Sequence, residues 1–202
     1  MYAVLHGAEF IFDTDDDNFV LDGDAKFLPR STKLPEGWTL NTPTTGATVF
    51  NPYPHWGVDT WPRGFPLTQI TNVTTRTGVR PAASTNAPAL PPRVCALQSL
   101  ANADPDVDAL YRLTGGLPLY FPPQRAWLAY PAGTYAPFNA QATLFDARAL
   151  SAALALPVTV HGRVSDIWRS YIMQRAMWDL GCGLAFADPW CVRGFAVAVP
   201  KG

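Results

Sequence analysis

The chain has 202 residues, a formal net charge of −1, and a composition in which 48% of residues are hydrophobic and 15% are charged. That is enough apolar material for one domain with a core, and it excludes a chain that stays disordered for lack of hydrophobic residues. The 15 Lys and Arg residues are scattered, so no basic stripe of the kind typical of nucleic-acid-binding proteins is present. No run of about 18 apolar residues occurs, and no membrane span is predicted in this chain.

The first half of the chain predicts few regular elements. Residues 1–7 are expected to end a helix at Gly7, and Glu9-Phe10-Ile11-Phe12 is a short buried strand that ends abruptly in an acidic cluster. Residues 22–65 show little helical periodicity, with a short strand expected at Val49-Phe50. Residues 74–92 are rich in Thr, Ala and Pro, which predicts a flexible insertion within a single domain spanning 1–202.

The second half predicts more regular structure. A short helix should open at Asp104, with Pro105 at its first position, and the best helix runs from Asp166 to Leu180. Ser165 is the expected N-cap of that helix and Gly181 its stop. Three further strands are expected, at residues 144–145, 158–160 and 184–186.

The cysteines and the N-terminus bear on the compartment. Cys95, Cys182 and Cys191 have no CxxC spacing, so a zinc or redox site is not supported. One disulfide is compatible with the odd count, but three free, partly buried thiols are the expectation. The first residues lack the pattern of a signal peptide because acidic residues arrive too early, so an address in the secretory pathway would have to come from sequence outside this chain.

The acidic cluster that ends the first strand is the most informative local feature. Asp15 and Asp17 are spaced so that both carboxylates can face one hard cation, with Asp13 as a third candidate ligand. In open α/β sheets, ligands bind beyond the carboxyl ends of the strands. Oxygen ligands favour Mg²⁺ or Mn²⁺ over zinc, and such an ion can stabilise the charge of a departing diphosphate.

Two simpler interpretations of the cluster stay open. It can be a solvated acidic turn. It can also be an EF-hand calcium loop, since Asp13, Asp15, Asp17 and Asp24 match four ligand positions, although Asn18 stands where that loop needs glycine. The entering segment also has the pattern of a strand rather than a helix, which argues against a calcium-binding module.

The last helix carries two candidate residues. A projection places Arg175 in the middle of an apolar stripe that contains Ile167, Trp168, Tyr171, Ile172 and Trp178. There it either pairs with Asp179 four residues on or reaches a phosphate. Asp166 lies in the first turn on the other face, where it either pairs with Arg169 under the favourable helix dipole or acts as the base that deprotonates a sugar hydroxyl.

Three loop residues complete the candidates. Arg63 lies in a loop stiffened by prolines and flanked by Trp61 and Phe65, where it either stacks on Trp61 or binds a sugar or phosphate. His55, in a loop rich in aromatic residues, is a candidate ligand contact. Asp108, with Asp106 beside it, is a weaker catalytic candidate, because acidic residues are expected at a helix start in any case.

Taken together, these segments resemble the STELLO family of glycosyltransferase-like proteins. The matching stretches, in chain order, are YAVLHGA (2–8), IFDTDD (11–16), NPYPHWG (51–57), WPRGFPL (61–67), PDVDA (105–109), PFN (137–139), TLF (143–145), LPV (156–158) and SDIWRSY (165–171). A more distant likeness to the UDP-arabinopyranose mutases, or reversibly glycosylated polypeptides, rests on the aspartate triplet, the Arg-Gly-aromatic-Pro loop and the Asp-aliphatic-Trp helix start.

The resemblance implies a GT-A-like α/β fold, a mixed sheet with flanking helices. It also implies a transfer of sugar that depends on Mn²⁺ or Mg²⁺, from a nucleotide-sugar with UDP as the nucleotide to a glycan acceptor. By position, Asp15, Asp16 and Asp17 would form the metal motif, Arg63 a donor-site residue and Asp166 the base. The family context also implies the Golgi and cell-wall polysaccharide synthesis, with a non-catalytic role in assembling polysaccharide (cellulose) synthase as the alternative. Because the acidic motif starts at Asp13, the N-terminal nucleotide-binding strands are expected to be missing, and this chain alone is expected to be inactive.

Overall fold

The structure is a computed structural model that describes residues 2–20, 39–43, 48–75, 79–81, 93–152 and 159–193. The helices are α1 (Tyr2–Leu5), α2 (Ala109–Thr114), α3 (Ala147–Ala152) and α4 (Gly162–Asp179), with short 3₁₀ turns η2 (Tyr53–Trp56), η3 (Leu67–Gln69) and η4 (Val73–Thr75). The strands are β1 (Phe10–Thr14), β2 (Asn18–Val20), β3 (Thr39–Pro43), β4 (Val79–Pro81), β5 (Val94–Ala103), β6 (Ala126–Ala129), β7 (Ala142–Asp146) and β8 (Gly183–Arg193).

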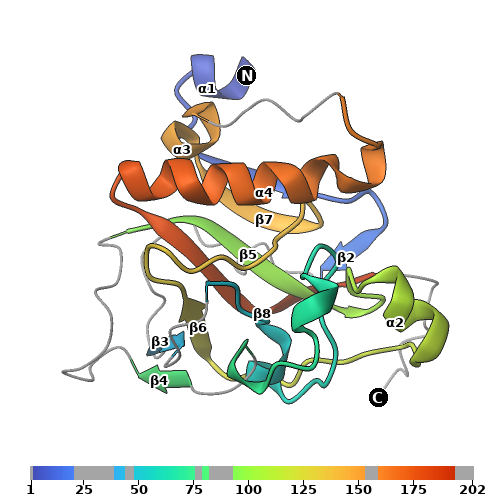
Figure 1. Cartoon of the computed structure of the whole chain (residues 1–202). Coiled ribbons are helices and arrows are strands. Elements are labelled where there is room, and N and C mark those ends of the chain that lie inside the picture. Colours follow the sequence, from blue (N-terminus) through green and yellow to red (C-terminus); the bar gives the residue numbers. More distant parts are fainter. Residues whose placement is uncertain are drawn as a thin grey trace.

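The strands form one mixed sheet in the order β1-β7-β5-β8-β6-β3-β4, with β2 added to the end of β8 (Figure 1). Strands β5 and β8 are parallel, whereas β7 is antiparallel to both β5 and β1. Strands β1, β5 and β8 therefore run in the same direction, and their carboxyl ends lie at one edge of the sheet. A mixed sheet with helices confirms the α/β architecture that was predicted.

Successive side chains of the central strands point to opposite faces of the sheet, so the hydrophobic core is divided between the two faces. Leu184 and Phe186 of β8 belong to the larger cluster, which also contains Met173 and Met177 of α4. Ala185, next to them in sequence, belongs to a second, smaller cluster. Helix α4 accordingly crosses one side of the sheet above β7 and β5 (Figure 1).

The bounds and orientation of α4 differ from the prediction. The helix begins at Gly162, where the ring of His161 accepts a hydrogen bond from the Arg163 amide, so Ser165 lies inside it rather than at its cap. The predicted apolar stripe was wrong as a core face, because Trp168 and Ile172 are 55% and 54% exposed. The buried face instead includes polar residues with partners: Gln174 donates to and accepts from the backbone of Ala136 (2.8 and 3.0 Å).

Several other elements were placed wrongly or missed. The helix expected at Asp104 begins at Ala109, with Asp108 as its N-cap. Strands β5 and β6 were not predicted, and Thr159 and Val160 form a turn and a bend rather than a strand. Strand β1 rather than a helix enters the acidic turn, which argues against an EF-hand, and the residues where the exiting helix of such a loop would begin lie outside the described residues. Most of the 74–92 insertion, and Asp24, lie outside the described residues.

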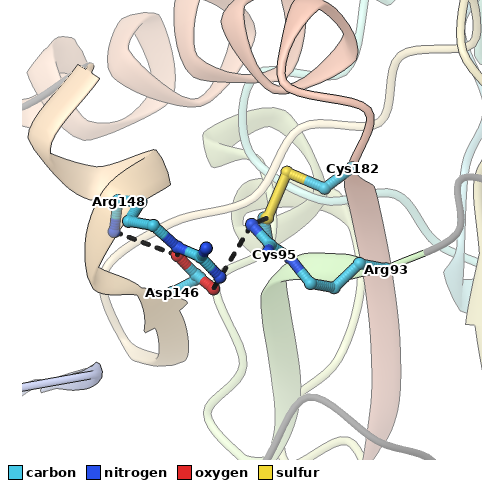
Figure 2. Close-up of a disulfide and its surroundings, with 5 residues drawn as sticks. All are labelled: Arg93, Cys95, Asp146, Arg148 and Cys182. Atoms are coloured by element: carbon cyan, nitrogen blue, oxygen red, sulfur yellow. Dashed lines mark hydrogen bonds and ion pairs between the residues drawn. A yellow bond between two sulfur atoms is a disulfide. The ribbon is translucent and has the colours of Figure 1, made fainter.

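The expectation of three free thiols was also wrong. Cys95, near the start of β5, and Cys182, just before β8, form a disulfide, while Cys191 is free and buried. The parallel pairing of β5 with β8 brings the two strand starts together, although 87 residues separate them in sequence. Figure 2 shows the bond beside Arg93, whose Nη2 lies 3.3 Å from the Cys95 sulfur and 3.4 Å from Asp146.

Candidate functional site

Charged residues follow the three co-directional strands β1, β5 and β8 at the edge where they end. The acidic turn Asp15–Asp17 follows β1, the segment Asp104–Asp106 follows β5, and Arg193 is the last residue of β8. The Asp104 amide donates to the Arg193 carbonyl (3.2 Å), which ties two of these ends together. This edge is where an open α/β sheet places its ligands, so we take it as the candidate site.

Arg193 joins the carboxylates of the acidic turn. Its guanidinium lies 3.5 Å from Asp15 and 3.0 Å from Asp17. Asp13 lies within β1, two residues before Asp15, and contacts Arg169 of α4 instead (3.1 Å). The Arg169 guanidinium also lies over the ring of Phe145. Asp15 and Asp17 therefore share the guanidinium of Arg193, whereas Asp13 links β1 to α4.

Arg63 forms a clamp between two other carboxylates. Its Nε and Nη2 donate to Asp106 (2.8 Å each), and its Nη1 and Nη2 donate to Asp166 (3.0 and 2.7 Å). Nη1 also donates to the Arg163 carbonyl in the first turn of α4. This bidentate geometry on both sides fixes the Arg63 loop against α4 and holds Asp166 in one orientation. Neither stacking of Arg63 on Trp61 nor pairing of Asp166 with Arg169 is the arrangement found.

The clamp is anchored in the core through Asp106. Asn139 donates from Nδ2 to Asp106 (2.7 Å), and both side chains are buried. The backbone N–H of Asn139 donates to the side-chain oxygen of Gln98 of β5 (3.0 Å). The hydroxyl of Thr143 of β7 lies within hydrogen-bond distance of that same oxygen and of the Asn139 carbonyl, and its one proton can be donated to either. A chain of satisfied hydrogen bonds thus runs from the middle of the sheet to Asp166, which gives the site a rigid base.

The electrostatics connect the clamp with the acidic turn. Burial raises the pKa of Asp15 above its usual value; Arg193 opposes this rise, while the charges of Asp17, Asp106 and Asp166 add to it. Burial alone would lower the pKa of Arg63, but its hydrogen bonds to Asp106 and Asp166 outweigh this and hold that pKa above its usual value. The four carboxylates therefore act on one another within a single site.

The remaining candidates lie apart from this site. Asp108 accepts a hydrogen bond from the Leu110 amide (2.8 Å) as a helix cap. Arg175 is exposed and pairs with Asp179 (2.6 Å), the simpler of the two alternatives. His55, on η2, packs edge-on against Trp56, whose indole donates to Asp188 (2.7 Å). Burial lowers the pKa of His55, an effect that the Asp188 charge partly offsets.

The carboxylates of the turn fit a divalent cation only as a partial ligand set. Asp15 and Asp17 reach the same guanidinium, so both can serve one cationic centre. Within the described ranges, no three His, Cys, Asp or Glu side chains are arranged to hold a metal. Mg²⁺ commonly takes one or two protein carboxylates and fills its other positions with substrate phosphates and water, and two converging carboxylates fit that pattern.

No role was predicted for Asn139 or Arg193, and Asp106 was weighed together with Asp108 as a weak candidate at the expected helix start. Asp106 could have been found by the rule that singled out Asp15, because it too follows a buried strand. That strand, β5, went unrecognised, so the rule was not applied there. Nothing in the sequence near Arg193 indicates that it faces the acidic turn, since the contact depends on the pairing of β2 with β8.

Comparisons with known proteins place the chain in a family. The probable glycosyltransferase STELLO1 of Arabidopsis thaliana is 29% identical over 205 residues, which cover 96% of this chain and 26% of the relative. The probable glycosyltransferase STELLO2 of the same plant is 30% identical over 201 residues, covering 94% of this chain and 25% of the relative. No family model matches the chain. The chain spans about a quarter of the length of these relatives, and over nearly its whole length it belongs to the STELLO family, as its motifs predicted. The more distant likeness to UDP-arabinopyranose mutases stays a prediction.

Proposed function

We propose that this STELLO-family chain forms the metal-binding and acceptor side of a glycosyltransferase domain. The observation that carries the proposal is the meeting of the acidic turn and the Arg63 clamp at the carboxyl edge of the sheet. The similarity to two probable glycosyltransferases supports the reaction class. The donor would be a nucleotide-sugar, with UDP as the nucleotide, and the acceptor a glycan.

Asp166 is the proposed base. Arg63 occupies one side of its carboxylate and α4 fixes its backbone, yet an ionised carboxylate has lone pairs left for an acceptor hydroxyl. The side chain is 18% exposed, so a substrate can reach it. Because every nitrogen of the Arg63 guanidinium already donates to the clamp, the role we propose for Arg63 is to orient Asp166 rather than to bind the donor phosphates.

Asp15 and Asp17 would hold the Mn²⁺ or Mg²⁺ ion. Bound there, the ion would act as a Lewis acid that stabilises the charge on the departing diphosphate. Asp13 is occupied by Arg169 and would support β1 rather than serve as a ligand.

The nucleotide would be held by the part of the relatives that this chain does not span. Strand β1 is the outermost strand on one side of the sheet, and within the described residues it pairs only with β7. No described strand pairs with its other side, to which the strands of a complete GT-A-like domain could add. The isolated chain should therefore bind UDP-sugars weakly, with no heat above background in calorimetry at micromolar protein, and micromolar affinity would contradict this part of the proposal.

The Golgi and cell-wall polysaccharide synthesis are the proposed setting. The disulfide supports an oxidising compartment, where such bonds persist. No helix in the described part of the chain is long and apolar enough to cross a membrane.

The test is donor turnover by the longest protein that contains this chain, with Mn²⁺ and a panel of UDP-sugars. The double variant Asp15→Asn/Asp17→Asn should lose both turnover and Mn²⁺ binding, and Asp166→Asn should lose turnover while it keeps Mn²⁺ binding. Glu9→Gln, an exposed carboxylate beside β1, is the matched control and should behave as wild type. A protein that neither transfers nor hydrolyses any sugar would refute the proposal and favour the role in assembling polysaccharide synthase.

A further inference from the structure

The outer face of α4 carries an open groove whose residues have no part in the metal and base chemistry proposed above. Its volume is about 740 Å³, and we call it the α4 groove. Its walls include the side chains of Tyr135, Val164, Trp168, Tyr171, Ile172 and Arg175. On the helix, the groove lies opposite the buried face that contains Met173 and Met177.

The groove exposes apolar side chains that lie together. Val164, Trp168 and Ile172 follow one another at intervals of four residues and are 37%, 55% and 54% exposed, so they form one stripe along the helix. Single exposed apolar residues are ordinary, but a contiguous patch in a concave surface indicates a binding site. A ligand seated here would gain part of the hydrophobic free energy of removing these side chains from water.

The Arg63 loop connects the groove to the candidate site. Gly64 has a φ of +85°, and a Cβ atom on it would overlap Cγ2 of Ile167, so the loop lies directly against α4. Tyr171 of the groove donates a hydrogen bond to the Gly64 carbonyl (3.0 Å). Arg63, the residue before Gly64, holds the proposed base Asp166. A ligand in the groove would therefore lie next to the loop that orients this base.

The lining chemistry selects an uncharged ligand. Among the described residues of the lining, the one charged side chain is Arg175, and it already pairs with Asp179 at 2.6 Å. Tyr135 packs between Tyr171 (ring centroids 5.6 Å apart) and Trp178 (4.7 Å), which makes a rigid aromatic wall. Aromatic faces with few polar groups suit the apolar C–H faces of pyranose rings, whereas a nucleotide or an acidic peptide would find no free cation.

We propose that the α4 groove binds neutral sugar units of the acceptor glycan, with Trp168 as the stacking platform. The inference rests on the proposed transferase function, because a glycan here adjoins the Arg63–Asp166 clamp. The volume of the groove falls in the range of roughly 300 to 1,000 Å³ that is typical of small-molecule pockets, which is room for a few sugar units.

The test is calorimetric titration of the 202-residue chain with four neutral hexasaccharides: cellohexaose, xylohexaose, laminarihexaose and maltohexaose. No donor is present, so the result does not depend on turnover. We expect millimolar or tighter binding of at least one hexasaccharide, at least tenfold weaker binding by Trp168→Ala, and retention by Trp168→Phe. Tyr120→Ala is the matched control, since Tyr120 is an aromatic residue of nearly equal exposure (54%) outside the groove.

The outcomes separate the two proposals. Failure of all four hexasaccharides to bind, or equal binding by Trp168→Ala and wild type, would overturn the groove assignment. A change of oligomeric state in Trp168→Ala during sedimentation, without a change in sugar binding, would also overturn it and indicate a protein interface. Sugar binding that depends on Trp168, in a full-length protein that turns over no donor, would support the groove and refute the transferase function.

Discussion

Loss of the Cys95–Cys182 disulfide should remove a large part of the stability of this chain. The bond closes a loop of 87 residues, and in the chain-entropy model such a cross-link disfavours the unfolded state by about 4 to 5 kcal/mol at about 25 °C. Domains of this size are stable by only about 5 to 15 kcal/mol in total. Both cysteines are almost fully buried in the main core cluster, so the reduced thiols would keep most of the packing, and the entropic contribution should dominate the loss.

Equilibrium urea unfolding of the oxidised chain, the reduced chain and the double variant Cys95→Ala/Cys182→Ala measures this effect. Cys191→Ala is the control, because it removes a buried sulfur that forms no bond. The reduced chain and the double variant should unfold at clearly lower urea concentration than the control, and thiol titration of the denatured oxidised chain should count one thiol rather than three. A double variant that unfolds together with Cys191→Ala would refute the reasoning.

Three further predictions concern charged residues. Arg63→Gln should destabilise the fold by about 2 to 4 kcal/mol, measured by urea unfolding, because it leaves the nearly buried Asp106 carboxylate without its cation; an unchanged midpoint would contradict the clamp. Asp15→Asn should raise the melting temperature at pH 7 and have no effect at pH 3, because a raised pKa means that ionisation costs stability as the pH rises above the usual aspartate value. Asp146→Asn should instead lower the melting temperature at pH 7. Burial raises the pKa of Asp146, but hydrogen bonds from Arg148 and the charge of Arg93 lower it by more. The ionised carboxylate therefore stabilises the fold at pH 7, and this stabilisation is lost as the pH falls through the lowered pKa. Equal effects of the two Asn variants at pH 7 would contradict both assignments.

The acidic turn after β1 was predictable from sequence, because it depends only on the local pattern of apolar and acidic residues. An apolar run that stops at Asp13 identifies both the strand and the turn after it, and β1 spans Phe10–Thr14 as a result. The Arg63 loop was found through its unusual Trp-Pro-Arg-Gly composition. Which carboxylates Arg63 contacts was not predictable, since they lie 43 and 103 residues away, and only the folded sheet brings them together.

The face of α4 was misjudged for a different reason. Periodicity assigns apolar residues to the core, but this helix buries Arg169, Ser170 and Gln174, each with a hydrogen-bonding partner, and exposes Trp168 and Ile172. Polar residues can be buried when the surrounding backbone satisfies them, and no sequence pattern reveals such partners. The disulfide escaped prediction in the same way, because it follows from the parallel pairing of β5 with β8.

The balance of charge at the strand ends bears on the proposed metal. The clamp and the Arg193 contacts together bring two guanidinium groups, Arg63 and Arg193, against four carboxylates, those of Asp15, Asp17, Asp106 and Asp166. Within this set of six groups, two negative charges are in excess. Burial is the main reason that the pKa of Asp15 is raised, and the charges of Asp17, Asp106 and Asp166 add to the rise while Arg193 opposes it, so the ionised carboxylate is held at a cost in free energy. A divalent cation between Asp15 and Asp17 would supply the two missing charges and relieve that cost. The same excess would repel a diphosphate when no cation is bound, so donor binding at this edge should require the metal first. A UDP-sugar that binds the longest protein containing this chain equally well with and without Mn²⁺ would show that the charge is balanced in some other way.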